Sequence, residues 1–196
     1  MKRKKISINN NKDLKKFYRR LFIYKSVIYK NTLFSSSCSK IKDIVKALNI
    51  KNRKDRITFI YDSACFYADD YMKKQNPNFC GFENGRCHIQ KYSGCIYKNG
   101  CCRNCYYQSD KGCRTSNLIC KFFFCNEVKK RYNVVKIKDV KILKLFSFRQ
   151  RQIIKSGYFI SRESFINSLY IGSIIVHMIK SVILIITRLR SRIVRN

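Results

Sequence analysis

The sequence predicts a mostly α-helical protein with a loop-rich, metal-stabilised cysteine module and a C-terminal helix that is either amphipathic or membrane-spanning. Three observations lead to this fold class. Apolar residues recur at helical spacing in three segments before residue 76, and again after residue 163. Nine of the 11 cysteines lie between Cys80 and Cys125. The net charge of +32 is concentrated on either side of these cysteines.

The charge distribution divides the chain into parts. Residues 1–60 contain 18 lysines and arginines against 3 acidic residues and form a predicted basic helical arm. Residues 61–127, with 9 basic and 6 acidic residues, form a predicted helix followed by the cysteine-rich module. The remaining residues hold 16 basic and 2 acidic side chains. They are expected to form a basic connector (128–162) and an amphipathic or transmembrane helix with a basic tail (163–196).

Three helices are predicted before the cysteines. We expect the first to be capped by Asn11 and the second by Ser39, because small polar side chains favour the position before a helix. The third begins near Asp55 and must end before Pro77, since the residue preceding a proline is pushed out of the helical region. The apolar stripe of the first helix is Leu14, Phe17, Tyr18, Leu21, Tyr24 and Ile28.

Two further elements are predicted after the cysteines. Residues 133–148 are rich in β-branched side chains and partly alternate between apolar and polar residues, which predicts a short strand. The periodicity from Glu163 onward predicts one long helix that closes the chain.

The cysteine spacing favours metal ligation. Four thiolates converge readily on one zinc ion, and the two residues between Cys102 and Cys105 give the spacing of a ligand pair. Cys80 and Cys87 bracket a glycine-containing turn and could complete the first site, with His88 as another candidate ligand. A second site could use Cys113, Cys120 and Cys125 with Cys95 or Cys101. An iron–sulfur cluster could use the same thiolates.

Other roles for the thiols stay open. Disulfides are favoured by secretion and an even cysteine count, whereas the block has nine cysteines. The basic N-terminus has an apolar run, "LFIY", that ends at Lys25 without a small-residue cleavage site. We therefore expect a cytoplasmic, membrane-associated protein that is not secreted. Cys38 and Cys65 lie outside the block and are predicted to be small buried apolar residues.

The stretches "YDSACFYADDYMKKQN", "CGFENGRC", "GCCRNC", "GC" and "ICKFFFC" occur in this order along the chain. This pattern resembles a group of uncharacterised small cysteine-rich bacterial proteins, in which a helix is followed by clustered cysteines. The resemblance covers about residues 60–125. It implies a shared module but no known activity, and it does not include the basic segments on either side.

The C-terminal helix raises the question of a membrane. Leu169–Ile186 is about long enough to span a bilayer, but His177 and Lys180 interrupt it. Polar side chains gather on one side of the predicted helix and isoleucines, leucines and valines on the other. Three placements follow: a spanning helix, a helix lying in the membrane interface, or a helix packed on the protein itself.

Composition and motifs favour binding over catalysis. We find no phosphate-binding glycine loop, and two histidines and few acids leave little for acid–base chemistry, so enzymatic activity is uncertain but not expected. The first hypothesis is a zinc- or iron–sulfur-stabilised protein that contacts a membrane surface or bilayer through residues 169–196. The second is a nucleic-acid-binding protein, with Arg103, Tyr106, Tyr107 and Arg114 contacting a single strand. The third is a redox protein with an iron–sulfur cluster. No small-molecule substrate is inferred.

Overall fold

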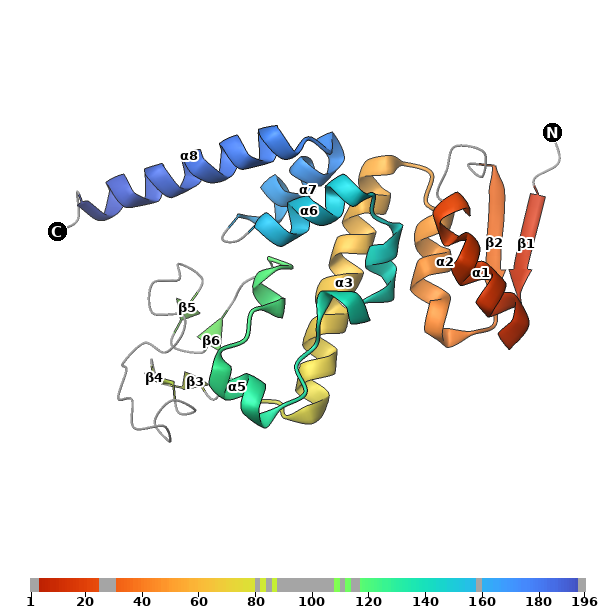
Figure 1. Ribbon diagram of the computed structural model, residues 1–196, viewed down its shortest axis with the longest axis horizontal. Helices are drawn as coiled ribbons and strands as arrows, with labels where there is room; N and C mark the ends of the chain where they lie inside the picture. Colours follow the sequence, from red (N-terminus) through yellow and green to blue (C-terminus); the bar gives the residue numbers. More distant parts are fainter. Residues whose placement is uncertain are drawn as a thin grey trace.

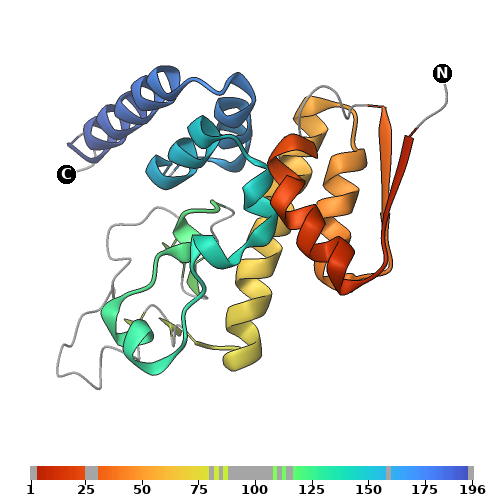
Figure 2. The same ribbon diagram turned by 45° about the vertical axis from the view of Figure 1, so that its right-hand side comes forward.

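The computed structural model describes residues 4–24, 31–79, 82–83, 86–87, 108–109, 112–113, 117–157 and 160–193. These residues form seven α-helices, three two-stranded sheets and short 3₁₀ turns. The predicted mostly helical class is therefore confirmed. The long helix α3 (Arg53–Gln75) runs through the middle of the molecule, with α1, α2 and the β1–β2 pair on one side of it (Figure 1). The helices α6, α7 and α8 lie on the other side (Figure 2).

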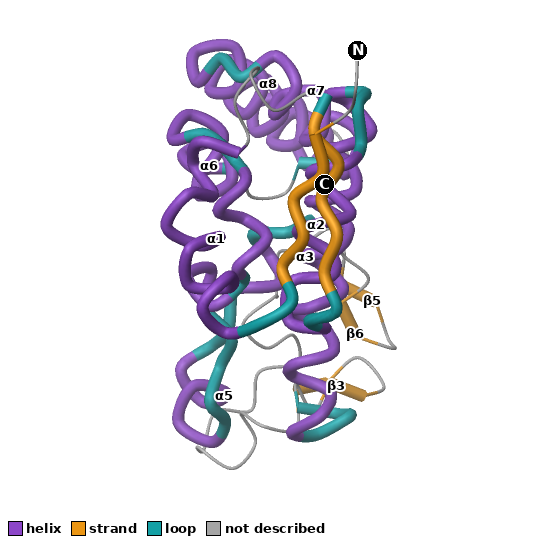
Figure 3. Tube along the Cα trace, turned by 90° about the vertical axis from the view of Figure 1, so that its right-hand side faces the viewer, coloured by secondary structure: helices purple, strands orange, loops and turns teal. Residues whose placement is uncertain are grey.

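The N-terminal region contains a parallel strand pair as well as helices. The strand β1 (Lys4–Ile8) pairs with β2 (Thr32–Ser36), in the register Lys4↔Thr32 to Ile8↔Ser36. The two strands lie side by side at one end of the molecule (Figure 3). They are connected through α1 (Asn11–Tyr24), because parallel strands require a crossover. The predicted basic arm thus includes two strands that helical spacing did not reveal.

The first two helices begin slightly differently from the prediction. Asn10, one residue before the predicted cap Asn11, accepts a hydrogen bond from the backbone N–H of Asp13 at 2.8 Å. Ser39 begins a 3₁₀ turn (Ser39–Ile41) and not the helix itself, and α2 (Lys42–Asn49) follows this turn. The amide of Asn49 then joins α2 to β2: it donates to the carbonyl of Phe34 at 2.8 Å and accepts from its N–H at 2.9 Å.

The helix α3 provides the central packing surface. The side chain of Asn52 caps it by accepting from the backbone N–H groups of Lys54 and Asp55. The helix ends at Gln75, and Asn76 has extended dihedrals (φ −159°, ψ 123°), as the prediction from Pro77 requires. Its buried stripe is Ile57, Ile60, Tyr61, Ala64, Ala68 and Met72.

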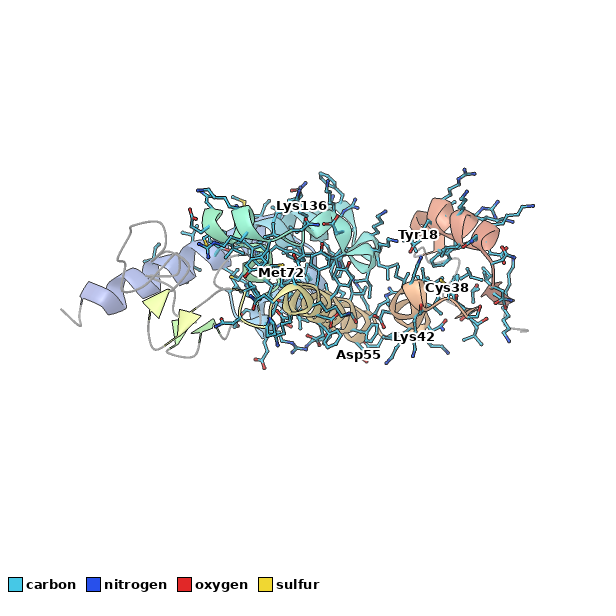
Figure 4. All side chains as sticks on the ribbon, turned by 90° about the horizontal axis from the view of Figure 1, so that it is seen from below. Tyr18, Cys38, Lys42, Asp55, Met72 and Lys136 are labelled. Atoms are coloured by element: carbon cyan, nitrogen blue, oxygen red, sulfur yellow. The ribbon has the colours of Figure 1, made fainter. Side chains whose placement is uncertain are left out.

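The predicted strand at 133–148 is wrong. After α5 (Asn126–Arg131) the chain forms two 3₁₀ turns, Ile137–Asp139 and Lys141–Leu145. The second turn buries both Ile142 and Leu143, which are adjacent in sequence and would point to opposite faces of a strand. Burying neighbours against α1, α2 and α3 requires a turn. The side chain of Met72 on α3 is buried, whereas Lys136, just before the first 3₁₀ turn, is exposed at the surface (Figure 4).

The predicted single C-terminal helix is also wrong, because it is divided at Gly172. The helix α6 (Phe148–Ser156) precedes α7 (Arg162–Ile171), and α8 (Ile174–Ile193) follows after a turn. Gly172 has a φ of 69°, a left-handed conformation that glycine adopts without a steric penalty and that ends α7. One hydrophobic core extends from Ile8 to Leu169 and includes residues from α1, α2, α3, α6 and α7.

Candidate membrane interface and the cysteine-rich segment

The helix α8 carries an apolar face that points away from the protein body. Its members recur at intervals of three and four residues, which places them on one side of the helix. Their exposed fractions range from 46% to 71%. They are Ile175, Met178, Ile179, Val182, Ile183 and Ile186. The predicted separation into apolar and polar sides is thus present, and the apolar side faces outward.

The polar side of α8 faces the protein. His177 is fully buried and packs edge-to-face on Phe165 of α7, with 5.8 Å between the ring centroids. Ser173 and Ser181 are half-buried on the same side, and α8 packs along α6. Within the described residues α8 is therefore packed on the protein, by its polar side and not by its apolar side. Among the helices that the structure describes, none combines the length and apolar character needed to cross a membrane.

Exposed cations accompany this apolar face. Lys180 lies on α8 itself and is exposed. Arg149, Arg151 and Lys155 are exposed on α6, the helix against which α8 packs. An exposed cation thus shares α8 with the apolar face, and further cations lie on the neighbouring helix. Basic and apolar side chains on one helix are typical of helices that lie on anionic lipid surfaces.

Most of the predicted metal ligands lie outside the described residues. This is so for Cys80, Cys95, Cys101, Cys102 and Cys105, for His88, and for the predicted nucleic-acid contacts Arg103, Tyr106, Tyr107 and Arg114. Within the described part of the chain, no group of three or more histidine, cysteine or acidic side chains could hold a metal ion. The structure thus neither assembles nor separates the predicted sites.

Two of the cysteines lie in small antiparallel hairpins. The strand β3 (Phe82–Glu83) pairs with β4 (Arg86–Cys87), with Phe82 opposite Cys87. The strand β5 (Gln108–Ser109) pairs with β6 (Gly112–Cys113), with Gln108 opposite Cys113. Cys87 and Cys113 therefore hold the same backbone position in two similar hairpins. The turn predicted between Cys80 and Cys87 stays a prediction, because Asn84 and Gly85, between the two strands of the first hairpin, lie outside the described residues.

The end of the cysteine block is fixed by a buried asparagine. Asn117 donates to the carbonyls of Gly157 at 2.7 Å and Ile160 at 2.8 Å. Its side-chain oxygen accepts from the backbone N–H groups of Ile119 at 3.0 Å and Cys120 at 3.2 Å. Asn117 thereby attaches the turn containing Cys120 to the segment between α6 and α7. The sequence analysis missed this residue, although an asparagine before an apolar run is a local signal for a turn of this kind.

The C-terminal end of the block is also attached to α3. The hydroxyl of Tyr61 accepts from the backbone N–H of Leu118 at 2.9 Å. The ammonium of Lys121 contacts both oxygens of Asp69, at 2.6 and 2.8 Å. Just beyond the C-terminus of α3, the ring of Phe79 packs edge-to-face on that of Phe124, with 6.0 Å between centroids. Phe79 and Phe124, near the two ends of the block, are therefore in contact.

The cysteines nearest this attachment are half-buried, and Cys125 packs against the core. Cys120 and Cys125 are half-buried, in the turn Cys120–Phe122 and just before α5. Cys38 and Cys65 are half-buried against the core, close to their predicted role as small apolar residues. Burial raises the pKa of the Cys65 thiol to about 12, an effect that the nearby charge of Lys121 reduces only in part. Cys65 is therefore protonated and a poor nucleophile at neutral pH.

Three of the four carboxylates of α3 are engaged in ion pairs. Asp62 accepts two hydrogen bonds from the guanidinium of Arg162 at the start of α7, at 2.8 and 2.5 Å. Asp69 pairs with Lys121, and Asp70 with Lys74 at 2.6 Å. Asp62 and Asp69 thus join α3 to other parts of the fold, whereas the pair of Asp70 and Lys74 lies within the helix. Comparisons of the chain with family models, curated protein sequences and solved structures found no match.

Proposed function

We propose that this protein is a non-enzymatic peripheral membrane protein that binds the anionic cytosolic face of a bilayer through α8. The observation that carries the proposal is the outward apolar face of α8, from Ile175 to Ile186. Exposed isoleucine and valine side chains gain free energy on leaving water, about 25 cal/mol per Å² of apolar surface. A helix lying in the membrane interface buries one face in this way and leaves the rest of the protein in water.

The charge of the protein supports an anionic lipid as the partner. A net charge of +32 attracts a negatively charged surface. Each lysine or arginine close to such a surface contributes about 1 kcal/mol. Lys180 and Arg149 are exposed on the two helices that would approach the lipid. Apolar insertion and charge attraction therefore act together on the same part of the molecule.

We further propose that bound metal organises the cysteine block, with zinc as the first candidate and an iron–sulfur cluster as the alternative. Nine cysteines within so short a segment are suited to four-thiolate sites. The attachment of Phe79 to Phe124 holds the ends of the segment together, so that a metal would have to order a closed loop only. A loop of this size has too small a hydrophobic core to be stable alone, and metal ligation would supply the missing folding free energy.

Vesicle flotation tests the membrane proposal. The protein should float with vesicles that contain phosphatidylglycerol, and poorly with vesicles of phosphatidylcholine alone. Ile179→Asp should weaken binding by roughly 10- to 100-fold, because it places a carboxylate in the apolar face. The matched control is Phe66→Asp on α3, whose side chain is 73% exposed but remote in sequence from α8. It should bind like the wild type.

Two results would contradict this proposal. One is equal binding by Ile179→Asp and Phe66→Asp, which would mean that charge alone attracts the protein. The other is a cellular pool that nuclease releases and detergent does not, which would favour the nucleic-acid hypothesis instead. Flotation at higher salt separates the contributions further, because salt screens the charge attraction and leaves apolar insertion intact.

A further inference from the structure

A cavity lined by three arginines lies where α3 and α6 begin and α7 ends. Its volume is about 760 Å³. Arg53 and Arg56 come from the first turn of α3, and Arg149 from the first turn of α6. The remaining wall is largely apolar and includes Ile57 and Phe146. The described lining contains no carboxylate, so the cavity has a positive charge without a negative one.

Within the described part of the chain, no carboxylate pairs with the three arginines. Among the ion pairs that the described residues form, none includes Arg53, Arg56 or Arg149. Burial lowers the pKa of Arg56, and the positive charge of Arg53 lowers it further. The charges of Arg53 and Arg56 therefore repel each other, and the side chain of Arg56 is half-buried. Such an arrangement costs stability unless an anion occupies it.

The surrounding residues hold the arginines in place. The guanidinium of Arg53 lies over the ring of Tyr170, 5.3 Å from its centroid, which restrains it by a cation–π contact. The α7–α8 turn approaches Arg53 closely: a Cβ atom added to Gly172 would lie 3.8 Å from its guanidinium nitrogen. Restrained guanidinium groups lose less conformational entropy when they bind a phosphate.

The cavity also adjoins the proposed membrane face. Phe148 and Ile171 line it, and their side chains are 66% and 51% exposed. Only the turn at Gly172 and Ser173 separates Ile171 from α8. The positive cavity is therefore beside apolar side chains at the start of the helix that would lie in the interface, where lipid phosphates are found.

We propose that Arg53, Arg56 and Arg149 bind the phosphate of an anionic phospholipid, and that they prefer the doubly charged monoester phosphate of phosphatidic acid to a phosphodiester. Guanidinium groups bind phosphate oxygens in a bidentate manner, and three of them match a dianion better than a monoanion. This proposal rests on the proposed membrane function, because it takes the phosphate from a lipid. A soluble phosphate monoester offers the same chemistry and is the alternative source.

Flotation with two matched vesicle sets tests it. The first set contains phosphatidic acid and the second phosphatidylglycerol, at amounts that give equal surface charge. We expect about tenfold tighter binding to phosphatidic acid, which corresponds to one well-formed charged hydrogen-bond pair. Arg53→Gln/Arg56→Gln should lose this preference. Its binding to phosphatidylglycerol should weaken only as much as the removal of two positive charges from elsewhere on the surface weakens it. Arg149→Gln, at an exposed position, should lose part of the preference without risk to folding.

The matched control is Arg19→Gln/Arg20→Gln, which removes the same charge from an exposed surface of α1. This variant should keep the preference. Equal loss in both double variants would overturn the proposal, as would equal wild-type binding to the two lipids at matched charge. No flotation with any vesicle would overturn the lipid as the source and contradict the proposed function itself. Protection from thermal unfolding by glycerol 3-phosphate that depends on Arg53 and Arg56, without a lipid preference, would assign the cavity to a soluble phosphate instead.

Discussion

The imidazole of His177 meets the ring of Phe165 edge-to-face, with 5.8 Å between centroids and 79° between planes. Neither ring nitrogen of His177 has a hydrogen-bond partner among the described residues, although the side chain is fully buried. The contact between α7 and α8 thus buries an imidazole whose two nitrogens make no hydrogen bond to the described residues. This explains how a helix can pack with its polar side inward, since an edge-to-face ring pair tolerates an imidazole. It also implies that the contact is weaker than an apolar one.

Replacing His177 with leucine should strengthen the attachment of α8. The wild type buries two nitrogen atoms away from water without a hydrogen bond, which costs free energy. Leucine removes this cost, so the free energy of unfolding should rise by about 1 kcal/mol. Denaturant unfolding followed by circular dichroism measures it. His177→Gln is the control, because it keeps polar atoms at the same place and should give no gain. A loss of stability in His177→Leu would show that the imidazole makes a favourable contact here.

The same histidine should make stability depend on pH. Burial lowers the pKa of His177 from its ordinary value of 6.5, and the positive charge of Lys180 lowers it further. Below about pH 6.5 the histidine is protonated in the unfolded chain but still neutral in the native state. The free energy of unfolding is therefore highest above this pH and decreases as the pH falls, until the native histidine is protonated as well. The slope cannot exceed about 1.4 kcal/mol per pH unit for one proton. The measurement is the free energy of unfolding of the wild type minus that of His177→Leu, between pH 7.5 and 5. Both proteins contain His88, so its contribution cancels in this difference. Parallel curves would contradict the prediction.

Gly157→Ala should be among the most damaging small substitutions in the core. A Cβ atom at this position would lie only 1.7 Å from Cε2 of Phe165, and that ring is fully buried. The ring cannot move without disturbing the α6–α7 packing, so we expect a loss of about 2–3 kcal/mol in thermal or denaturant unfolding. Gly172→Ala is the comparison. It meets no atom closer than 3.8 Å and should cost only about 1–2 kcal/mol, from its left-handed backbone.

The sequence predicted those elements whose signals are local. The end of α3 follows from Pro77 alone, and the amphipathic pattern of α8 follows from its spacing. The strand pair β1–β2 was missed because its pairing joins residues 28 positions apart, and short lysine-containing strands have no distinctive period. The 3₁₀ turns near Ile142 were read as a strand because β-branched residues were taken as evidence of extension, whereas packing against α3 decided the backbone.

The candidate site was predictable only in part, for a related reason. Helical spacing shows that α8 has an apolar side, but not that His177 and the serines would face the protein and leave the isoleucines outside. The arginine cavity combines Arg53 and Arg149, which are far apart in sequence and converge only in the fold. The cysteine cluster was visible at once because its density is a property of composition, which does not depend on folding.

Asn117→Leu should detach the end of the cysteine block from the helical body. The variant leaves the carbonyls of Gly157 and Ile160 and the N–H groups of Ile119 and Cys120 without this side chain, at a cost of about 2–4 kcal/mol. Cys120 should then react faster with a thiol reagent, as measured by mass spectrometry of labelled peptides. Asn117→Asp is the control: it retains the acceptor and loses the donor, so the effect should be intermediate. Unchanged labelling of Cys120 in the leucine variant would contradict this role.

Metal removal should affect the cysteine block more than the helical body. The core from Ile8 to Leu169 is built from buried apolar side chains and, among the described residues, uses no group that could hold a metal. The block lacks such a core, so its order should depend on about one or two metal ions per chain. A chelator should therefore raise thiol reactivity and protease cleavage between residues 80 and 116 while the helical circular dichroism signal persists. Metal content of the gently purified protein is the decisive measurement, and a brown, visible-absorbing protein would identify an iron–sulfur cluster in place of zinc. Less than about half an equivalent of metal, or cysteines found oxidised in pairs, would contradict the proposed module, because disulfides would then supply the cross-links that thiolate ligation is expected to provide.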